Sequence, residues 1–201
     1  IKKKIVDAAP ELKPIVDEYY GIRILNQEFV ETLISFIISQ NSNIPRIRKT
    51  VREISKTYGK LIDEADGACS FPDIEALDSI SEQDYRNLKT GFRAAYLRDA
   101  VNRLISGEID ENELKNMDFR TAKNTLMTIK GVGDKVANCV LLFGLGFRNA
   151  FPVDVWIKRI MEELYFGRDT DKTVIENYAA DKFGELGGYA QQYLFIYAKN
   201  K

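Results

Sequence analysis

The segment LMTIKGVGDKVANCVLLFGLGFRNAFPVDVWIK, residues 126–158, indicates the fold more clearly than any other part of the chain. Apolar residues return every three or four positions on both sides of the turn Ile129-Lys130-Gly131-Val132-Gly133. Its two glycines permit positive φ angles and leave the main chain without side chains in the way. We therefore predict a helix, a tight glycine hairpin and a second helix, with Val132 folded back into the core.

This hairpin is also a candidate binding element. Successive main-chain NH groups in such a turn, followed at once by a helix N-terminus, form a site for a phosphate oxygen, here at Gly131, Val132 and Gly133. We expect Asp134 to cap the second helix, so that Lys135 lies in its first turn. The helix dipole opposes a positive charge there, which favours the neutral amine that a lysine nucleophile needs. An ordinary exposed helix lysine would show the same local pattern.

A second helix start follows at Phe151-Pro152-Val153-Asp154. Pro152 restricts the approach of the chain, and Asp154 is predicted to be the N-cap. Aspartate is common at helix caps, so this residue alone indicates only where a helix begins. A functional role is indicated more specifically by one longer pattern: a glycine hairpin, a lysine two residues later and a cap aspartate behind a proline.

The rest of the chain shows the same helical periodicity, and we predict an all-α protein. The periodic stretches are Phe29–Ile38, Ile44–Tyr58, Ala94–Ile105, Val136–Leu145, Val155–Tyr165 and Tyr189–Tyr197. Convincing strand alternation is absent, and we expect the glycines and prolines, Gly187 and Gly188 among them, to lie between the helices. No internal repeat or Pro/Ser-rich linker separates parts of the chain.

The composition excludes several kinds of chemistry. With 45% hydrophobic and 29% charged residues, the 201-residue chain is typical of a soluble globular protein. The apolar stretches are too short to span a membrane, and no signal-peptide region follows Ile1, so we expect an intracellular protein. The chain has no histidine, and its two cysteines, Cys69 and Cys139, cannot build a four-thiolate site. We therefore expect no zinc site, no metal held by side chains and no His-based triad.

Charge is segregated along the chain although the net charge is only -1. Leu61–Asp84 holds eight acidic residues and no Lys or Arg. The stretch just before it carries a single acid, Glu53, among Arg46, Arg48, Lys49, Arg52, Lys56 and Lys60. This pattern predicts a positive face suited to nucleic acid, or simply a solvated helix beside an acidic loop.

Taken together, residues 126–158 resemble the helix-hairpin-helix Gly/Pro-Asp glycosylases, the superfamily of endonuclease III and of the adenine, alkyladenine and 8-oxoguanine glycosylases. The resemblance implies that the hairpin binds the DNA backbone, usually with a monovalent cation, and that Asp154 is the catalytic carboxylate. A lysine at Lys135 implies a bifunctional member, which forms a Schiff base with the sugar and then cleaves the strand. Lys130 stands where many relatives have proline, but the glycines do the steric work.

Three other patches resemble the 8-oxoguanine branch. Endonuclease III and most adenine glycosylases carry a four-cysteine iron-sulfur loop, which two cysteines cannot supply, so we expect no cluster. Residues 39–47, SQNSNIPRI, resemble the segment that contacts the orphaned cytosine, which implies this role for Asn41 and Arg46. Residues 91–96, GFRAAY, resemble the wedge, with Phe92 where the family usually has Tyr and Arg93 as the second cytosine contact.

The third patch, residues 188–195, resembles the pocket for the flipped base. A flipped purine needs an apolar surface on each face and a polar group at its Watson-Crick edge. Phe195 can stack on one face, Cys139 can lie against the other, and Gln191 can both donate and accept. Cys139 follows Lys135 by four residues and so shares its helix face. Without the resemblance, Phe195 and Cys139 would be ordinary core residues.

The resemblance implies two helical lobes with the active site between them, one of residues 28–133 and one of residues 1–27 with 134–201. The common 8-oxoguanine type also has an N-terminal sheet domain, which we expect upstream of Ile1 and which helps to recognise the lesion. A short archaeal type lacks that domain and ends in Lys, as Lys201 does, yet Gln191 and Phe195 favour the common type.

The activity expected from the resemblance is that of a monomeric 8-oxoguanine glycosylase and lyase acting on duplex DNA, preferably opposite cytosine. It would work in the cytoplasm or nucleoid of a prokaryote, or in the nucleus of a eukaryote. The alternatives are a non-catalytic helix-hairpin-helix DNA-binding module and a glycosylase of the same superfamily for another oxidised base. Phosphate binding alone needs neither Lys135 nor Asp154, which disfavours the first alternative.

Overall fold

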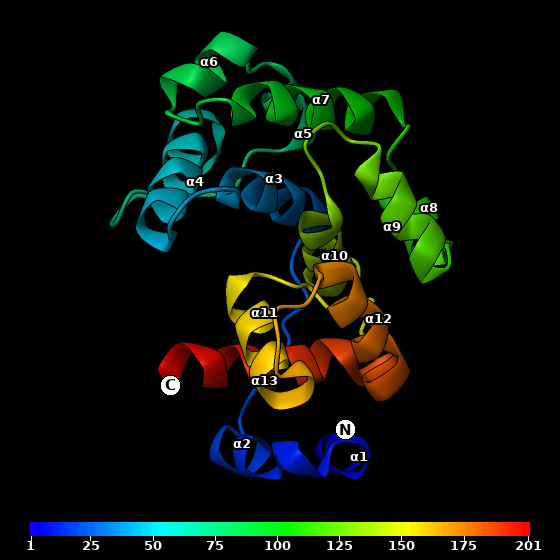
Figure 1. Cartoon of the computed structure of the whole chain (residues 1–201). Coiled ribbons are helices and arrows are strands. Elements are labelled where there is room, and N and C mark those ends of the chain that lie inside the picture. Colours follow the sequence, from blue (N-terminus) through cyan, green and yellow to red (C-terminus); the bar gives the residue numbers. More distant parts are fainter.

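Helices make up nearly all of the regular structure in the computed structural model, which describes residues 1–201 and confirms the predicted all-α class. Figure 1 shows an upper and a lower group of helices with α10 (Asp134–Phe143) between them. The upper group is α3 (Phe29–Ser39), α4 (Ile44–Tyr58), α5 (Ile74–Asp78), α6 (Glu82–Asn87), α7 (Arg93–Ser106), α8 (Glu111–Asn116) and α9 (Phe119–Met127).

The lower group is α1 (Lys2–Ala8), α2 (Lys13–Glu18), α11 (Val155–Met161), α12 (Lys172–Phe183) and α13 (Gly187–Asn200). Short 3₁₀ turns cover Pro10–Leu12 and Gly184–Leu186, and a π turn, Glu162–Phe166, continues α11. The one sheet is a small antiparallel hairpin of β1 (Leu61–Asp63) and β2 (Ala68–Cys69) inside the acidic segment. None of the helices has the length and apolar character needed to cross a membrane.

The buried apolar residues form two separate cores. The first gathers residues from Phe29 to Ala150, and the second combines α1 and α2 with residues from Phe151 onward. The apolar face of α10 belongs to the first core, whereas the sequence predicted a division after Gly133. The chain therefore changes from one core to the other between Ala150 and Phe151, directly before Asp154.

Gly187 and Gly188 do not lie between helices as predicted, because they form the first turn of α13. Space explains this placement. A Cβ on Gly188 would lie 2.3 Å from Leu142 Cδ1 and 2.9 Å from the carbonyl oxygen of Arg148. The glycine lets α13 approach the end of α10, and its NH donates to that Arg148 oxygen at 2.7 Å.

Candidate active site

The glycine hairpin is held against α7. Gly131 has a φ of +80°, and a Cβ there would lie 2.2 Å from Cδ2 of Tyr96, so both conformation and space require glycine. Gly133 is extended and needs no positive φ, which corrects the symmetric role predicted for the two glycines. Val132 is buried in the first core as predicted. The NH of Lys130 donates to Asp99 Oδ2 on α7 at 2.8 Å.

The start of α10 differs by one residue from the prediction. Gly133 is the N-cap, and Asp134 is already the first helical residue. The Asp134 carboxylate pairs with Lys123 Nζ at 2.9 Å instead of capping the helix. Lys135 nevertheless lies in the first turn, with its Nζ 4.9 Å from the ring centroid of Phe36 on α3.

Asp154 is the N-cap of α11, which confirms the prediction. Its backbone is extended, and its Oδ1 accepts from the NH of Ile157 at 2.8 Å. Lys135 and Asp154 thus begin two helices whose apolar faces belong to different cores. The two side chains form no ion pair with each other.

One cavity of about 240 Å³ brings together five side chains that the sequence singled out. We call it the central cavity, and it is lined by Phe36, Lys135, Cys139, Phe143, Pro152, Asp154, Gln191, Gln192 and Phe195. A second hollow of about 480 Å³, which we call the mouth, shares Lys135 and Asp154 with the cavity. Asn41, Asp134, Lys172 and Glu176 also line the mouth.

Within the central cavity, the Gln191 amide is oriented by hydrogen bonds inside the protein, and the Cys139 thiol is buried. Burial raises the pKa of Cys139 to about 11, and the nearby positive charge of Lys135 opposes this shift only in part, so the thiol is neutral at neutral pH. Gln191 is buried and donates to the carbonyl of Pro152 at 3.1 Å, while its Oε1 accepts from Gln192 Nε2 at 2.6 Å. An apolar slot with one oriented amide can hold a planar heterocycle.

Three cavity residues were not predicted from the sequence: Phe36, Phe143 and Gln192. Phe36 and Phe143 stack with ring centroids 5.8 Å apart. Phe143 follows Cys139 by four residues, so the helix face of Lys135 and Cys139 already pointed to it. Phe36 lies on α3, far away in sequence, and no local pattern marked it.

The predicted orphan-base set, Asn41, Arg46, Phe92 and Arg93, lies on turns and helix starts of the upper lobe. Asn41 has a φ of +46°, a conformation that Asn tolerates better than most residues. Phe92 is 49% exposed and packs edge to face against Tyr96, with ring centroids 5.8 Å apart. Arg46 is exposed and donates to the carbonyl of Lys89 at 3.3 Å.

Arg93 is placed quite differently from Arg46, since it is only 4% exposed. Its guanidinium donates to main-chain oxygens of Gln40 (2.7 Å from Nε), Asn41 (3.0 Å) and Thr90 (3.1 Å). Burial, with a smaller contribution from the charge of Arg46, lowers the pKa of Arg93. In this structure Arg93 supports the backbone that carries Asn41.

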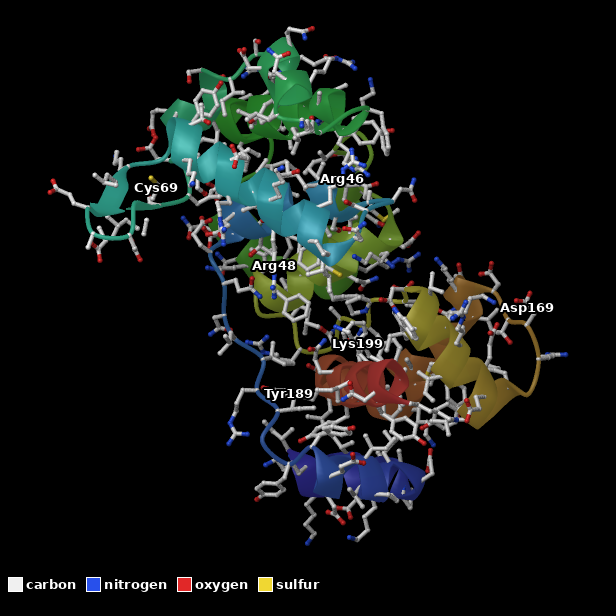
Figure 2. The ribbon with its side chains drawn as sticks, turned by 90° about the vertical axis from the view of Figure 1, so that its left-hand side faces the viewer. Arg46, Arg48, Cys69, Asp169, Tyr189 and Lys199 are labelled. Atoms are coloured by element: carbon white, nitrogen blue, oxygen red, sulfur yellow. The ribbon has the colours of Figure 1, made fainter.

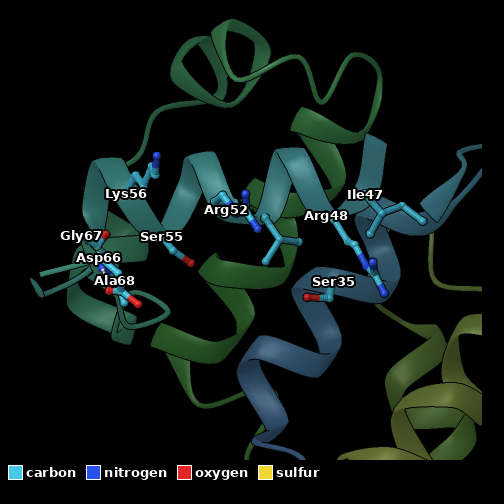
Figure 3. Close-up of a pocket in the computed structure, with 11 residues that line it drawn as sticks. Ser35, Ile47, Arg48, Arg52, Ser55, Lys56, Asp66, Gly67 and Ala68 are labelled. Carbon is cyan, nitrogen blue, oxygen red and sulfur yellow. Dashed lines mark hydrogen bonds between the residues drawn. The ribbon is translucent and has the colours of Figure 1, made fainter. Parts of the chain in front are cut away.

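A basic groove runs along α4 (Figure 3). Arg48, Arg52 and Lys56 lie on one face of the helix, beside Ser35 and Ser55, and line a hollow of about 710 Å³. Asp66 and Gly67 of the hairpin turn, with Ala68 and Cys69 of β2, line its other end. None of the three cations forms a salt bridge, so their charges are free to attract an anion. Figure 2 places Arg46 and Arg48 on the same helix, with Cys69 on the outlying hairpin.

A glycine hairpin between helices, a lysine just after it and an aspartate at the next helix start define a helix-hairpin-helix repair protein. The family described as "HhH-GPD superfamily base excision DNA repair protein" matches residues 34–184, and the chain belongs to this superfamily.

Solved structures and curated proteins agree with this assignment. The Clostridium acetobutylicum 8-oxoguanine glycosylase/lyase, in complex with double-stranded DNA containing cytosine opposite 8-oxoG, is 40% identical, with a TM-score of 0.93 over 99% of this chain and 69% of that one. A probable N-glycosylase/DNA lyase of Methanothermobacter thermautotrophicus is 32% identical over 92% of this chain. An N-glycosylase/DNA lyase of Arabidopsis thaliana is 34% identical over 93%. The chain spans 65% and 54% of the lengths of these two curated relatives.

Proposed function

We propose that this protein is a bifunctional glycosylase that excises 8-oxoguanine from duplex DNA and cleaves the strand at the resulting site. The observation that carries the proposal is the central cavity, where Lys135 and Asp154 meet the slot formed with Cys139, Gln191 and Phe195. The resemblance to the Clostridium acetobutylicum enzyme over 99% of the chain supports 8-oxoguanine as the lesion.

In this mechanism the damaged nucleotide leaves the stack and its base enters the central cavity. Phe195 stacks on one face of the base, the neutral Cys139 thiol packs against the other, and Gln191 bonds to its edge. The Lys135 amine then attacks C1′, and the electron pair of the glycosidic bond leaves with the base, which takes up a proton. Asp154 stabilises the positive charge that develops on the sugar and orients or deprotonates the amine.

Strand cleavage follows from the same covalent bond. Opening of the sugar ring converts the attached lysine into a protonated imine at C1′. The imine acidifies the hydrogens on C2′, and loss of one of them expels the 3′ phosphate by β-elimination. Water finally releases Lys135, so the protein is unchanged after one turnover.

The DNA around the lesion would be held by the hairpin and the upper lobe. The NH groups of Gly131 and Gly133 would bind a phosphate, whereas the NH of Val132, predicted as a third donor, already donates to the carbonyl of Ile129 at 3.0 Å. The carbonyl oxygens of Lys130 and Val132 accept no hydrogen bond within the protein, and main-chain oxygens of this kind suit the monovalent cation expected there. Phe92 would fill the gap, and Asn41 and Arg46 would bond to the orphaned cytosine.

Borohydride trapping tests the proposal, because the reductant converts the imine into a stable amine. We expect a covalent complex with a duplex containing 8-oxoguanine opposite cytosine, and its complete loss in Lys135→Gln. Lys172→Gln, which removes a second lysine from the mouth, is the matched control and should still be trapped.

Three other results would overturn the proposal. Trapping that persists in Lys135→Gln would exclude this residue as the nucleophile. Trapping only with a different oxidised base would assign the chain another lesion. DNA binding without trapping or excision on any lesion would leave a non-catalytic helix-hairpin-helix module.

A further inference from the structure

A polar network that includes Asp134 and Glu176 of the mouth joins three helices, and no step of the mechanism above uses it. Lys123 Nζ of α9 lies 2.9 Å from Asp134 Oδ1 of α10 and 2.9 Å from Glu176 Oε2 of α12. Asn138 Nδ2 donates to the carbonyl of Asp134 at 3.0 Å and to Glu176 Oε1. We call Lys123, Asp134, Asn138 and Glu176 the interlobe network.

The network is partly buried, unlike most ion pairs of the molecule. The side chains of Lys123 and Glu176 are 14% and 18% exposed, and Asn138 is fully buried. Burial alone would lower the pKa of Lys123, but the hydrogen bonds and charges of Asp134 and Glu176 raise it, so the ammonium stays charged. Asn138 Oδ1 is buried without a partner, so the Asn138 amide gives up one hydrogen bond while its NH₂ group stays bound to the network.

The network crosses the boundary between the two cores. Lys123 follows Ala122 of the first core, whereas Glu176 follows Ile175 of the second. Lys135 stands directly after Asp134, while Asp154 begins α11 in the other lobe. The distance between amine and carboxylate therefore depends on how the lobes are held together at this joint.

We propose that the Lys123–Glu176 ion pair is a positioning pair, which fixes the first turn of α10 against α12 and so sets Lys135 relative to Asp154. The inference rests on the proposed function, since it assumes that Lys135 is the nucleophile. Neither member of the pair lines the central cavity. The pair therefore acts on the covalent step and leaves recognition of the base unchanged.

The expected effect is large because catalysis is sensitive to small displacements. A shift of about 1 Å in a reacting group can cost roughly a hundredfold in rate. Removing one partner of a partly buried pair also leaves the other charge uncompensated, so the helices should move apart or admit water. Glu176→Gln is the cleanest change, because it keeps the shape and an acceptor for Asn138 while removing the charge.

The test compares single-turnover excision and borohydride trapping with DNA affinity. For Glu176→Gln we expect both rates to fall roughly ten- to a hundredfold, with a Kd within about threefold of the unmutated protein. Glu162→Gln is the matched control. It breaks the Lys158–Glu162 pair, whose side chains are 24% and 19% exposed and which lies inside one lobe. Its rates should stay within about twofold.

A double-mutant cycle with Lys123→Met sharpens the test. If the two residues act as one pair, Lys123→Met with Glu176→Gln should be little slower than the slower single variant. Should Glu176→Gln fail to fold, Glu176→Asp keeps the charge, shortens the side chain and is expected to give an intermediate rate.

Three outcomes would overturn the positioning pair: unchanged rates in Glu176→Gln, an equal loss in Glu162→Gln, or a rate loss matched by the loss of DNA affinity. Failure of the proposed function looks different, because the unmutated protein itself would then show no trapping.

Discussion

The central cavity and the orphan-base set are constructed in different ways. The cavity takes side chains from helices at spacings of four residues, such as Lys135 with Cys139 and Gln191 with Phe195, and all of its lining residues are buried or partly buried. The orphan-base set lies on turns, where Asn41 takes a left-handed conformation and Phe92 is half exposed. The cavity is therefore already assembled without DNA, whereas the orphan-base set leaves side chains free to meet a partner.

The two arginines of the orphan-base set show the same contrast on a smaller scale. Arg93 is buried, and four hydrogen bonds to main-chain oxygens use most of its five NH groups. Arg46 is exposed and makes a single, long hydrogen bond. We infer that Arg93 supports the backbone around Asn41 and that Arg46 contributes more to recognition of the opposite base.

The largest effect on the rate of excision is expected from a substitution in the central cavity. Asp154→Asn keeps an oxygen that can cap α11 but removes the negative charge next to the sugar. Excision should slow by roughly a hundred- to a thousandfold, the size seen when one electrostatic stabiliser of a transition state is lost. Single-turnover rates at saturating protein measure this, and the Kd for damaged duplex should change little.

A control separates charge from capping. Asp118 is the N-cap of α9 and accepts from the NH groups of Arg120 and Thr121. Asp118→Asn makes the same chemical change away from the cavity and should leave the rate intact. Equal losses of rate and affinity in Asp154→Asn would mean that this residue is mainly a structural cap.

The second effect tests Arg93 as a structural residue. Arg93→Ala leaves the carbonyls of Gln40, Asn41 and Thr90 without their donor and opens a cavity, so the free energy of unfolding should fall by about 2–4 kcal/mol. Urea unfolding measures the change. Arg103→Ala on the same helix removes two partly exposed ion pairs and should cost under about 1 kcal/mol. Similar losses in both variants would contradict the structural role of Arg93.

Elements with a local sequence signature were predicted, whereas very short elements and distant contacts were not. Helix periodicity and cap residues are local, so α3, α4, α7, α10, α11 and α13 were predicted, together with the cap Asp154 and the buried Val132. The short helices α5, α6 and α8, at five or six residues each, are too brief to show a period. The hairpin β1–β2 was missed for the same reason.

Long-range contacts could not be predicted from the sequence. The aromatic wall from Phe36, the role of Asp134 in an ion pair and the burial of Arg93 all depend on partners far along the chain. The resemblance named Arg46 and Arg93 as equal cytosine contacts, because a family motif records residue types and not their exposure. The functional roles of all these residues remain predictions.

The third effect concerns the choice of the opposite base. Cytosine presents acceptors to Arg46, whereas adenine has a different shape and edge, so excision should be faster opposite cytosine. Loss of one charge-assisted hydrogen bond is worth about 1–3 kcal/mol, so Arg46→Ala should narrow the preference roughly tenfold or more. Single-turnover rates on the two duplexes measure it. Lys49→Ala on the same helix should weaken binding to both duplexes alike.

The smallest effect is expected in the basic groove, which shares no lining residue with the central cavity and would contact only the DNA backbone. Each cation that neutralises a phosphate releases counterions, so log K falls with log salt by about 0.9 per contact. Arg52 lines the groove and has no ion-pair partner. If DNA passes along α4, Arg52→Ala should therefore lower that slope by about one unit. This slope can be measured by fluorescence anisotropy with an undamaged duplex at salt concentrations from about 50 to about 200 mM.

The control for this slope must carry the same change of net charge at another place. Lys3→Ala serves, because Lys3 is exposed on α1, at the opposite end of the molecule from α4 in Figure 1. If the slope changed only because the net charge changed, both variants would shift it equally. That shift should be small, because salt screens charges over about 10 Å. A slope reduced by Arg52→Ala alone would place a phosphate in the groove. An unchanged slope would mean that the segregated charge of α4 is only a solvated helix face, and that DNA contacts end near Arg46.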